Sequence, residues 1–149
     1  MEFTDAVRNV LNRKGSEVFS VSPDASVFDA VARLAEEDIG ALAVMEGSRL
    51  VGVFSERDYA RKVILLGRSS KDTRVSEAMT QPATCVSPDA TIDDCMRIMV
   101  TDRTRHLMVV QHDRLMGIVS IGDLVNWMIS TQAETIDRLH SYIAGSYPG

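Results

Sequence analysis

The sequence is poor in the residues that cross-link or metallate small proteins. Its 149 residues include two cysteines, Cys85 and Cys95, with no CxxC pairing and no histidine nearby at metal-ligand spacing. This pattern argues against a disulfide scaffold and against a structural zinc site. We interpret the two thiols as small, half-buried apolar side chains, with a redox role for either one left open.

Long apolar runs and a surplus of positive charge are also missing. No stretch approaches the length of a membrane span, and residues 1–11 carry Glu2, Asp5 and Arg8 instead of the apolar region of a signal peptide. The formal net charge is −5, whereas nucleic-acid binding needs a basic surplus to neutralise phosphates. We expect a cytoplasmic protein that acts on neither membranes nor nucleic acids.

Catalytic motifs are lacking as well. The sequence contains no GxSxG, no Walker loop, no HExxH and no pair of carboxylates in a setting that would tune their pKa values. The expectation is therefore that the protein is not an enzyme. A hydrophobic fraction of 45% still provides for a substantial core.

An internal repeat organises what is present. Residues 22–26 (SPDAS) recur as residues 87–91 (SPDAT), and residues 49–55 (RLVGVFS) recur as residues 114–120 (RLMGIVS). Both matches keep one offset of 65 residues (87 − 22 and 114 − 49). Two separated matches in one ungapped register indicate two copies of one structural unit.

Each copy predicts a β-α-β-β-α unit. The first strands are expected at 18–21 and 83–86, the helices at 26–37 and 91–102, and the hairpins at 41–45/50–54 and 106–110/115–119, with a last helix from Ser55 or Ser120. Ser26 with Asp29, and Thr91 with Asp94, have the spacing of helix caps.

The expected fold class is α+β, with the two sheets packed face to face because neither unit could bury its sheet alone. Flanking helices are predicted at 4–13 and 133–143, with apolar faces that need a covering surface: Val7, Val10 and Leu11, and Ile136, Leu139 and Ile143. The expected divisions are 1–16 (N-terminal helix and lead-in), 17–66 (repeat 1), 67–82 (connector), 83–130 (repeat 2) and 131–149 (C-terminal helix and tail).

The repeated element Gly-apolar-apolar-Ser-x-x-Asp is the candidate site. It runs from Gly52 to Asp58 and from Gly117 to Asp123, where a strand is followed by a helix. Free N–H groups at a helix start favour a phosphate, and an aspartate can accept both hydroxyls of a ribose. Ser-x-x-Asp is also the pattern of a capping box, so a purely structural role remains the alternative.

Several further segments, in this order along the chain, resemble a pair of cystathionine-β-synthase (CBS) domains, the Bateman module, of the small bacterial stand-alone type. They are 39–42 (IGAL), 55–59 (SERDY), 60–62 (ARK), 77–80 (EAMT), 105–107 (RHL) and 120–123 (SIGD). Where the family often has proline after the Arg-His-Leu triplet, this chain has Met108, which would leave the strand better paired.

The resemblance implies a cleft with two sites for an adenosine ligand: AMP, ATP, NAD or S-adenosylmethionine. It places the ligand on Gly40, Ala41, Ser55, Asp58, Thr80, Thr84, Arg105, His106, Ser120 and Asp123, and we add Arg57 to these candidates because it could clamp a phosphate. Asp58 and Asp123 would hold ribose, Ser55 and Ser120 would reach phosphate or ribose, Thr80 and Thr84 would border the adenine edge, and the remaining residues would border the base or phosphates.

Other basic residues could bind phosphate. Arg57 and Arg61 share a helical face with Lys62 beside them, and Arg103 and Arg105 point to one side of an extended segment; a solvated face is the alternative.

The resemblance further implies a regulatory, signal-transducing homodimer that acts on an effector protein of unknown identity. The rival hypothesis is an interaction scaffold with vestigial nucleotide sites.

Overall fold

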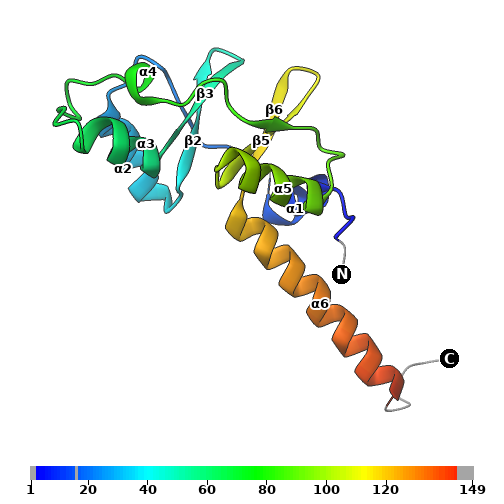
Figure 1. Cartoon of the computed structure of the whole chain (residues 1–149). Coiled ribbons are helices and arrows are strands. Elements are labelled where there is room, and N and C mark those ends of the chain that lie inside the picture. Colours follow the sequence, from blue (N-terminus) through cyan, green and yellow to red (C-terminus); the bar gives the residue numbers. More distant parts are fainter. Residues whose placement is uncertain (1–2, 16, 144–149) are drawn as a thin grey trace.

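The computed structural model, which describes residues 3–15 and 17–143, turns the sequence repeat into two three-stranded sheets (Figure 1). In each sheet the first strand pairs in parallel with the first strand of an antiparallel hairpin. The strands are β1 (Ser20–Val21), β2 (Ala41–Glu46) and β3 (Arg49–Ser55), then β4 (Cys85–Val86), β5 (His106–Gln111) and β6 (Arg114–Ser120). The predicted hairpins are confirmed.

The first strands are shorter than the predicted 18–21 and 83–86. Only two residues of each pair with the hairpin, and one further carbonyl, that of Phe19 or Thr84, accepts a hydrogen bond from the neighbouring strand. At Thr84 the donor is the Met108 N–H, at 2.9 Å. Proline has no N–H, so methionine at this position does leave the strand better paired, as expected.

The central helix of each unit forms as predicted. The helices are α2 (Val27–Glu37) and α5 (Ile92–Asp102), and the Oγ atoms of Ser26 and Thr91 accept from the N–H groups of Asp29 and Asp94. Each helix buries one apolar stripe against its own sheet.

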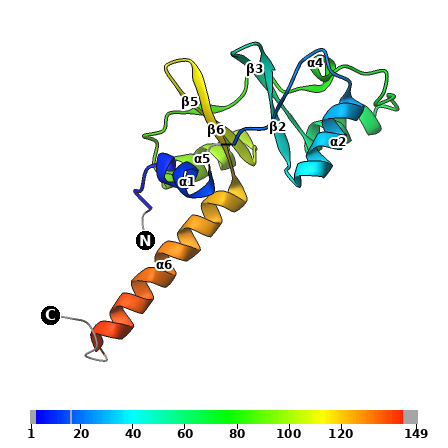
Figure 2. The same cartoon turned by 180° about the vertical axis from the view of Figure 1, so that it is seen from behind.

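The last helices of the two units differ. In the first unit α3 (Glu56–Tyr59) continues as the π-helical turn η1 (Ala60–Ile64). In the second unit a single helix, α6 (Ile121–Ile143), projects from the body of the protein (Figures 1 and 2). The prediction of a separate C-terminal helix at 133–143 is therefore wrong, because these residues continue α6. The expected boundary between repeat 2 and the C-terminal helix, after residue 130, falls inside α6. Neither proline nor glycine interrupts the chain between 123 and 143.

The two units exchange their leading helices. Helix α1 (Val7–Lys14) buries Val7 and Val10 in the core of the second unit, and α4 (Val75–Ala78), which lies in the expected connector, buries both of its end residues in the core of the first. The Val7 N–H donates to the Ala90 carbonyl at 2.8 Å, and the Val75 N–H donates to the Ala25 carbonyl at 2.9 Å. Each unit is thus completed by the segment that precedes the other one.

The apolar face of the N-terminal helix is therefore covered by the core of the second unit. The helix begins later than the predicted 4–13, because the preceding residues run extended along the start of α5: the Ile92 N–H donates to the Asp5 carbonyl at 2.9 Å, and the Asp93 N–H donates to the Phe3 carbonyl at 3.1 Å. Ile136 and Leu139 on α6 are exposed. The side chain of Ile143 lies outside the described residues.

The sheets bury both of their faces. Leu42 and Val44 of β2 belong to the core of the first unit, while Ala43 between them is fully buried on the opposite face. Met108 of β5 likewise alternates with residues of the second core and is 1% exposed. The second faces of the two sheets are therefore turned toward each other, as predicted.

Both cysteines are free, but neither is half-buried as expected. Cys85 is exposed, and Cys95 lies fully inside the core of the second unit. Burial, assisted by the nearby carboxylate of Asp94, raises the pKa of the Cys95 thiol to about 11. None of the described helices has the length and apolar character that crossing a membrane requires.

Candidate ligand site between the two units

A cleft of about 860 Å³ lies between the two units and collects most of the predicted site residues. The end of β3 and helix α3 form one wall, the connector forms the floor, and the segment from α5 to β5 of the second unit forms the other wall. Eight of the eleven predicted residues line it: Gly40, Ser55, Arg57, Asp58, Thr80, Thr84, Arg105 and His106. Ala41 does not, because it is 3% exposed within β2.

Asp58 is the most constrained side chain of the cleft. Its Oδ2 accepts from the N–H of Ser55 at 2.9 Å and from the Ser55 hydroxyl at 3.0 Å. Its Oδ1 accepts from the Thr80 hydroxyl at 2.8 Å and pairs with Lys62 Nζ at 3.2 Å. The capping box is therefore real, and it fixes a carboxylate that is only 7% exposed at the wall of the cleft.

The predicted role of the helix start is wrong in one respect. The N–H of Ser55 donates to Asp58, that of Glu56 donates to the Gly40 carbonyl at 3.1 Å, and that of Asp58 donates to Ser55 Oγ at 3.3 Å. These amides are not free for an anion, and α3 has only four residues. A phosphate in the cleft would have to be held by side chains instead.

Basic side chains supply that charge. Five cations line the cleft, Arg57, Arg61, Lys62, Arg103 and Arg105, against three carboxylates, Glu56, Asp58 and Asp102. Arg57 Nη1 also donates to the carbonyl of Arg103 at 2.9 Å, a direct bond from the first unit to the second. The local surplus of positive charge contrasts with the acidic chain and suits an anionic ligand.

Gly40 and His106 bring the two units into contact. A Cβ at Gly40 would lie 3.1 Å from the imidazole Cε1 of His106, so a larger residue would crowd the ring. Burial lowers the pKa of His106, the charges of Lys14 and Arg105 lower it further, and Asp123 only partly opposes them. The imidazole is therefore neutral at pH 7 and presents a flat, uncharged ring to the cleft.

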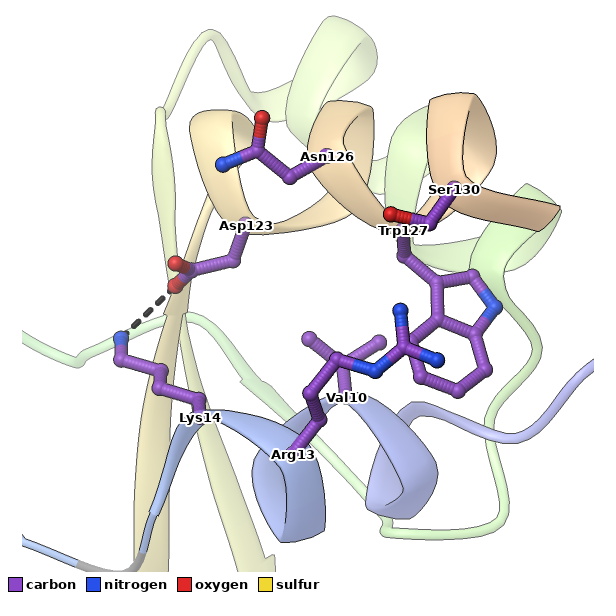
Figure 3. Close-up of a pocket in the computed structure, with 7 residues that line it drawn as sticks. All are labelled: Val10, Arg13, Lys14, Asp123, Asn126, Trp127 and Ser130. Carbon is purple, nitrogen blue, oxygen red and sulfur yellow. Dashed lines mark hydrogen bonds and ion pairs between the residues drawn. The ribbon is translucent and has the colours of Figure 1, made fainter. Parts of the chain in front are cut away.

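The second carboxylate lies elsewhere. Ser120 and Asp123 form the same local bonds, with the Ser120 N–H donating to Asp123 Oδ2 at 2.8 Å and the Asp123 N–H donating to Ser120 Oγ at 3.1 Å. Asp123, however, lines a separate cavity of about 190 Å³ between α1 and α6, where Lys14 Nζ lies 2.7 Å from its Oδ2 (Figure 3). Burial opposes ionisation of Asp123, but the bonds from Lys14 and Ser120 outweigh it and lower the pKa of the carboxyl.

Sequence reasoning missed Lys14, because it lies before the repeated segments. Trp127 packs against the N-terminal segment: its ring lies under the Arg13 guanidinium at 4.2 Å, and its Nε1 donates to Asp5 at 3.0 Å. Among the described residues, no three His, Cys, Asp or Glu side chains are grouped closely enough to hold a metal ion.

The fold and the cleft together define a module of two mutually completed α+β repeats around a shared cleft. The CBS domain family model matches residues 7–64 and 75–130, so the chain belongs to the CBS-domain family and carries a tandem pair of these domains.

Known proteins of similar sequence and structure agree with this assignment. The chain is 39% identical over 129 residues to the mitochondrial CBS domain-containing protein CBSX3 of Arabidopsis thaliana, covering 83% of this chain and 63% of that relative's length. A CBS-domain protein of Burkholderia ambifaria, described as a candidate signal-transduction protein, is 43% identical, with a TM-score of 0.83 and coverage of 86% of this chain and 96% of that one. A CBS-domain protein of Agrobacterium tumefaciens is 38% identical, with a TM-score of 0.78 and coverage of 83% and 99%.

Proposed function

We propose that the chain is a regulatory module that binds an adenosine nucleotide in the cleft between its two CBS domains and relays occupancy by a change in how the domains are placed. The observation that carries the proposal is the fixed Asp58 carboxylate in a cleft whose walls come from both domains. Membership of the CBS-domain family supports it, as does the similarity to a candidate signal-transduction protein.

In this proposal Asp58 holds the ribose. Its Oδ2 is committed to the helix cap, but Oδ1 is shared with two side chains that line the cleft, Thr80 and Lys62. A ribose hydroxyl can replace the Thr80 hydroxyl at Oδ1 without leaving a buried polar group unpaired. The neutral ring of His106 then offers a face on which the base can stack.

The arginines set the ligand preference. Arg57, Arg61, Arg103 and Arg105 can each donate to phosphate oxygens, and planar guanidinium groups do so through paired hydrogen bonds. A ligand with more than one phosphate uses more of them than AMP does. S-adenosylmethionine brings a sulfonium cation into a positive cleft, so we expect ATP and NAD to bind more tightly than AMP, and AMP more tightly than S-adenosylmethionine.

Occupancy is relayed through the bonds that join the domains. Arg57 donates to the Arg103 carbonyl across the cleft, and a phosphate that recruits Arg57 competes with this bond. Binding then shifts the population between two relative placements of the domains, which is what a regulatory readout requires. In this proposal the side chains of the cleft hold the ligand and do not react with it. The Ser55 hydroxyl is engaged as a donor to Asp58, and the His106 ring is uncharged.

Calorimetric titration of nucleotide-stripped protein tests the proposal. We expect saturable binding in the order ATP and NAD, AMP, then S-adenosylmethionine. The preference for several phosphates should shrink as salt rises, because it depends on charge. Absence of heat with all four ligands would leave the interaction scaffold as the better account, and consumption of a nucleotide would contradict a purely regulatory role.

A second copy of the chain is the partner we propose for the outer face of α6. Val125, Ile129, Ile136 and Leu139 are 39–62% exposed although apolar. Their spacings of four, seven and three residues follow the heptad pattern by which two helices pack along a seam. The helix projects from the sheets, so its own chain leaves this face accessible to the same face of a copy (Figure 2).

Polar substitution on this face is expected to change the oligomeric state. The double variant Ile129→Asn/Ile136→Asn should be monomeric in size-exclusion chromatography with light scattering, whereas the wild-type chain should be dimeric. Val100→Asn is the matched control, because Val100 is an apolar residue that is 75% exposed but belongs to α5 and not to the proposed seam on α6, so this variant should stay dimeric. A monomeric wild type, or a double variant that remains dimeric, would contradict the proposed interface.

A further inference from the structure

The two carboxylates that the repeat places at equivalent positions have different surroundings. Asp58 lines a cleft of about 860 Å³, within the range of about 300–1,000 Å³ that small-molecule sites occupy. Asp123 lines a cavity of about 190 Å³, below that range. The local bonds within Ser55–Asp58 and Ser120–Asp123 are alike, so the difference comes from what approaches each carboxylate from outside.

In the first domain the connector approaches as an extended chain. Helix α4 ends at Ala78, Met79 is extended, and the N–H of Thr80 donates to the Val53 carbonyl at 2.8 Å. The Thr80 hydroxyl then reaches Asp58 at 2.8 Å. The backbone lies flat along β3, and the space in front of the carboxylate stays open as the cleft.

In the second domain a helix takes this place. Leu11 of α1 covers Gly117 so closely that a Cβ there would lie 2.7 Å from its Cδ2, and α1 continues to Lys14. Lys14 Nζ donates to the Ile118 carbonyl and to Asp123 Oδ2, both at 2.7 Å. Ile118 and Asp123 are the counterparts of Val53 and Asp58, 65 residues later. One ammonium therefore bonds both the strand carbonyl and the carboxylate, as Thr80 does in the first domain with its N–H and its hydroxyl. The bond to Asp123, drawn in Figure 3, is to Oδ2, the oxygen that also accepts from the Ser120 N–H.

Lys62 does not close the first site in the same way. Its ammonium lies 3.2 Å from Asp58 Oδ1, but it also donates to the Met79 carbonyl at 3.2 Å and to the Thr80 hydroxyl at 3.3 Å. These longer, shared contacts run along the floor of the cleft. Lys14 instead places its charge directly on the carboxylate from a different element.

We propose that Lys14 decides which of the two equivalent carboxylates takes a ligand: its ammonium pairs with Asp123 Oδ2 and, together with α1, leaves only a small cavity in front of that carboxylate, so the chain binds one nucleotide, at Asp58. The inference rests on the proposed function. It assigns to Lys14 the selection of one site from a symmetric pair, a role that the repeat itself cannot encode.

The test is the stoichiometry of ATP binding to the full chain by calorimetry. Wild type should bind one equivalent, and Lys14→Ala should bind two, because alanine keeps the end of α1 helical and removes the ammonium. Arg8→Ala is the matched control: it removes one cation from the same helix, where Arg8 pairs with Asp89, and should still bind one equivalent. Adding Asp123→Asn to Lys14→Ala should restore one equivalent.

The outcomes separate this inference from the proposed function. Two equivalents in wild type, or one in Lys14→Ala, overturn the role of Lys14 and leave nucleotide binding intact. No binding by wild type overturns the proposed function at Asp58; binding gained by Lys14→Ala would then still support the role of Lys14. No binding by either protein overturns both.

Discussion

Asp58→Asn is expected to weaken ATP binding about tenfold or more and to remove most of the thermal stabilisation that ATP gives. Each hydrogen bond to a charged group contributes about 1.5–3 kcal/mol, and an amide can accept at only one of its two terminal atoms. The same change also loosens the cap of α3, because Asp58 Oδ2 accepts from the Ser55 N–H. The ligand-free variant should therefore lose about 1 kcal/mol of stability as well.

Asp94→Asn separates the two effects. Asp94 is the third residue of α5 and closes a capping box with Thr91, as Asp58 does with Ser55, but its side chain is 50% exposed and pairs with Arg97 away from the cleft. Thermal unfolding with and without ATP should show a small loss of stability in both variants and a lost ATP effect in Asp58→Asn alone. If both variants keep the ATP effect, Asp58 is a cap and no more.

Gly52→Ala is expected to destabilise the fold by about 1–3 kcal/mol. A Cβ at this position would lie 2.7 Å from the carbonyl oxygen of Thr80, which is backbone and cannot rotate away. Moving Thr80 breaks its two bonds with Val53 and withdraws its hydroxyl from Asp58. The variant should thus lose both stability and the geometry of the cleft.

Gly122→Ala is the control for this prediction. Its added Cβ would lie 3.6 Å from Ser120 Oγ, an ordinary contact, and Gly122 is in the first turn of α6. Alanine is the better helix former by up to about 1 kcal/mol, so this variant should be as stable as wild type or more stable. Urea unfolding measures both changes, and a Gly52→Ala variant as stable as wild type would contradict the close approach of Thr80.

The local structure could be predicted because it is encoded locally. Pairs of apolar runs joined by a short polar link predicted both hairpins, and the spacing of Ser26 with Asp29 and of Thr91 with Asp94 predicted two helix starts. The exchange of α1 and α4 could not be predicted in this way. Their docking pairs Val7 with Ala90 and Val75 with Ala25, contacts between distant segments that lie outside the offset of the repeat.

The residues of the candidate site were predicted better than their arrangement. The resemblance implied one cleft with two sites, and eight of the named residues do meet in one cleft. The inequality arises from Lys14, whose reach to Asp123 depends on how tightly α1 packs over Gly117. The expected anion site at the helix start failed because those amides are satisfied within the protein, which follows from three-dimensional contacts such as that between Glu56 and Gly40.

Mapping of backbone amide shifts by NMR during titration with ATP locates the bound nucleotide. We expect one saturable set of changes concentrated at residues 55–58 and 80–84 of one wall and floor and at residues 103–106 of the other wall, because one ligand contacts both domains. Changes confined to a single domain, changes centred on Asp123, or no changes at all would contradict a nucleotide bound between the two CBS domains.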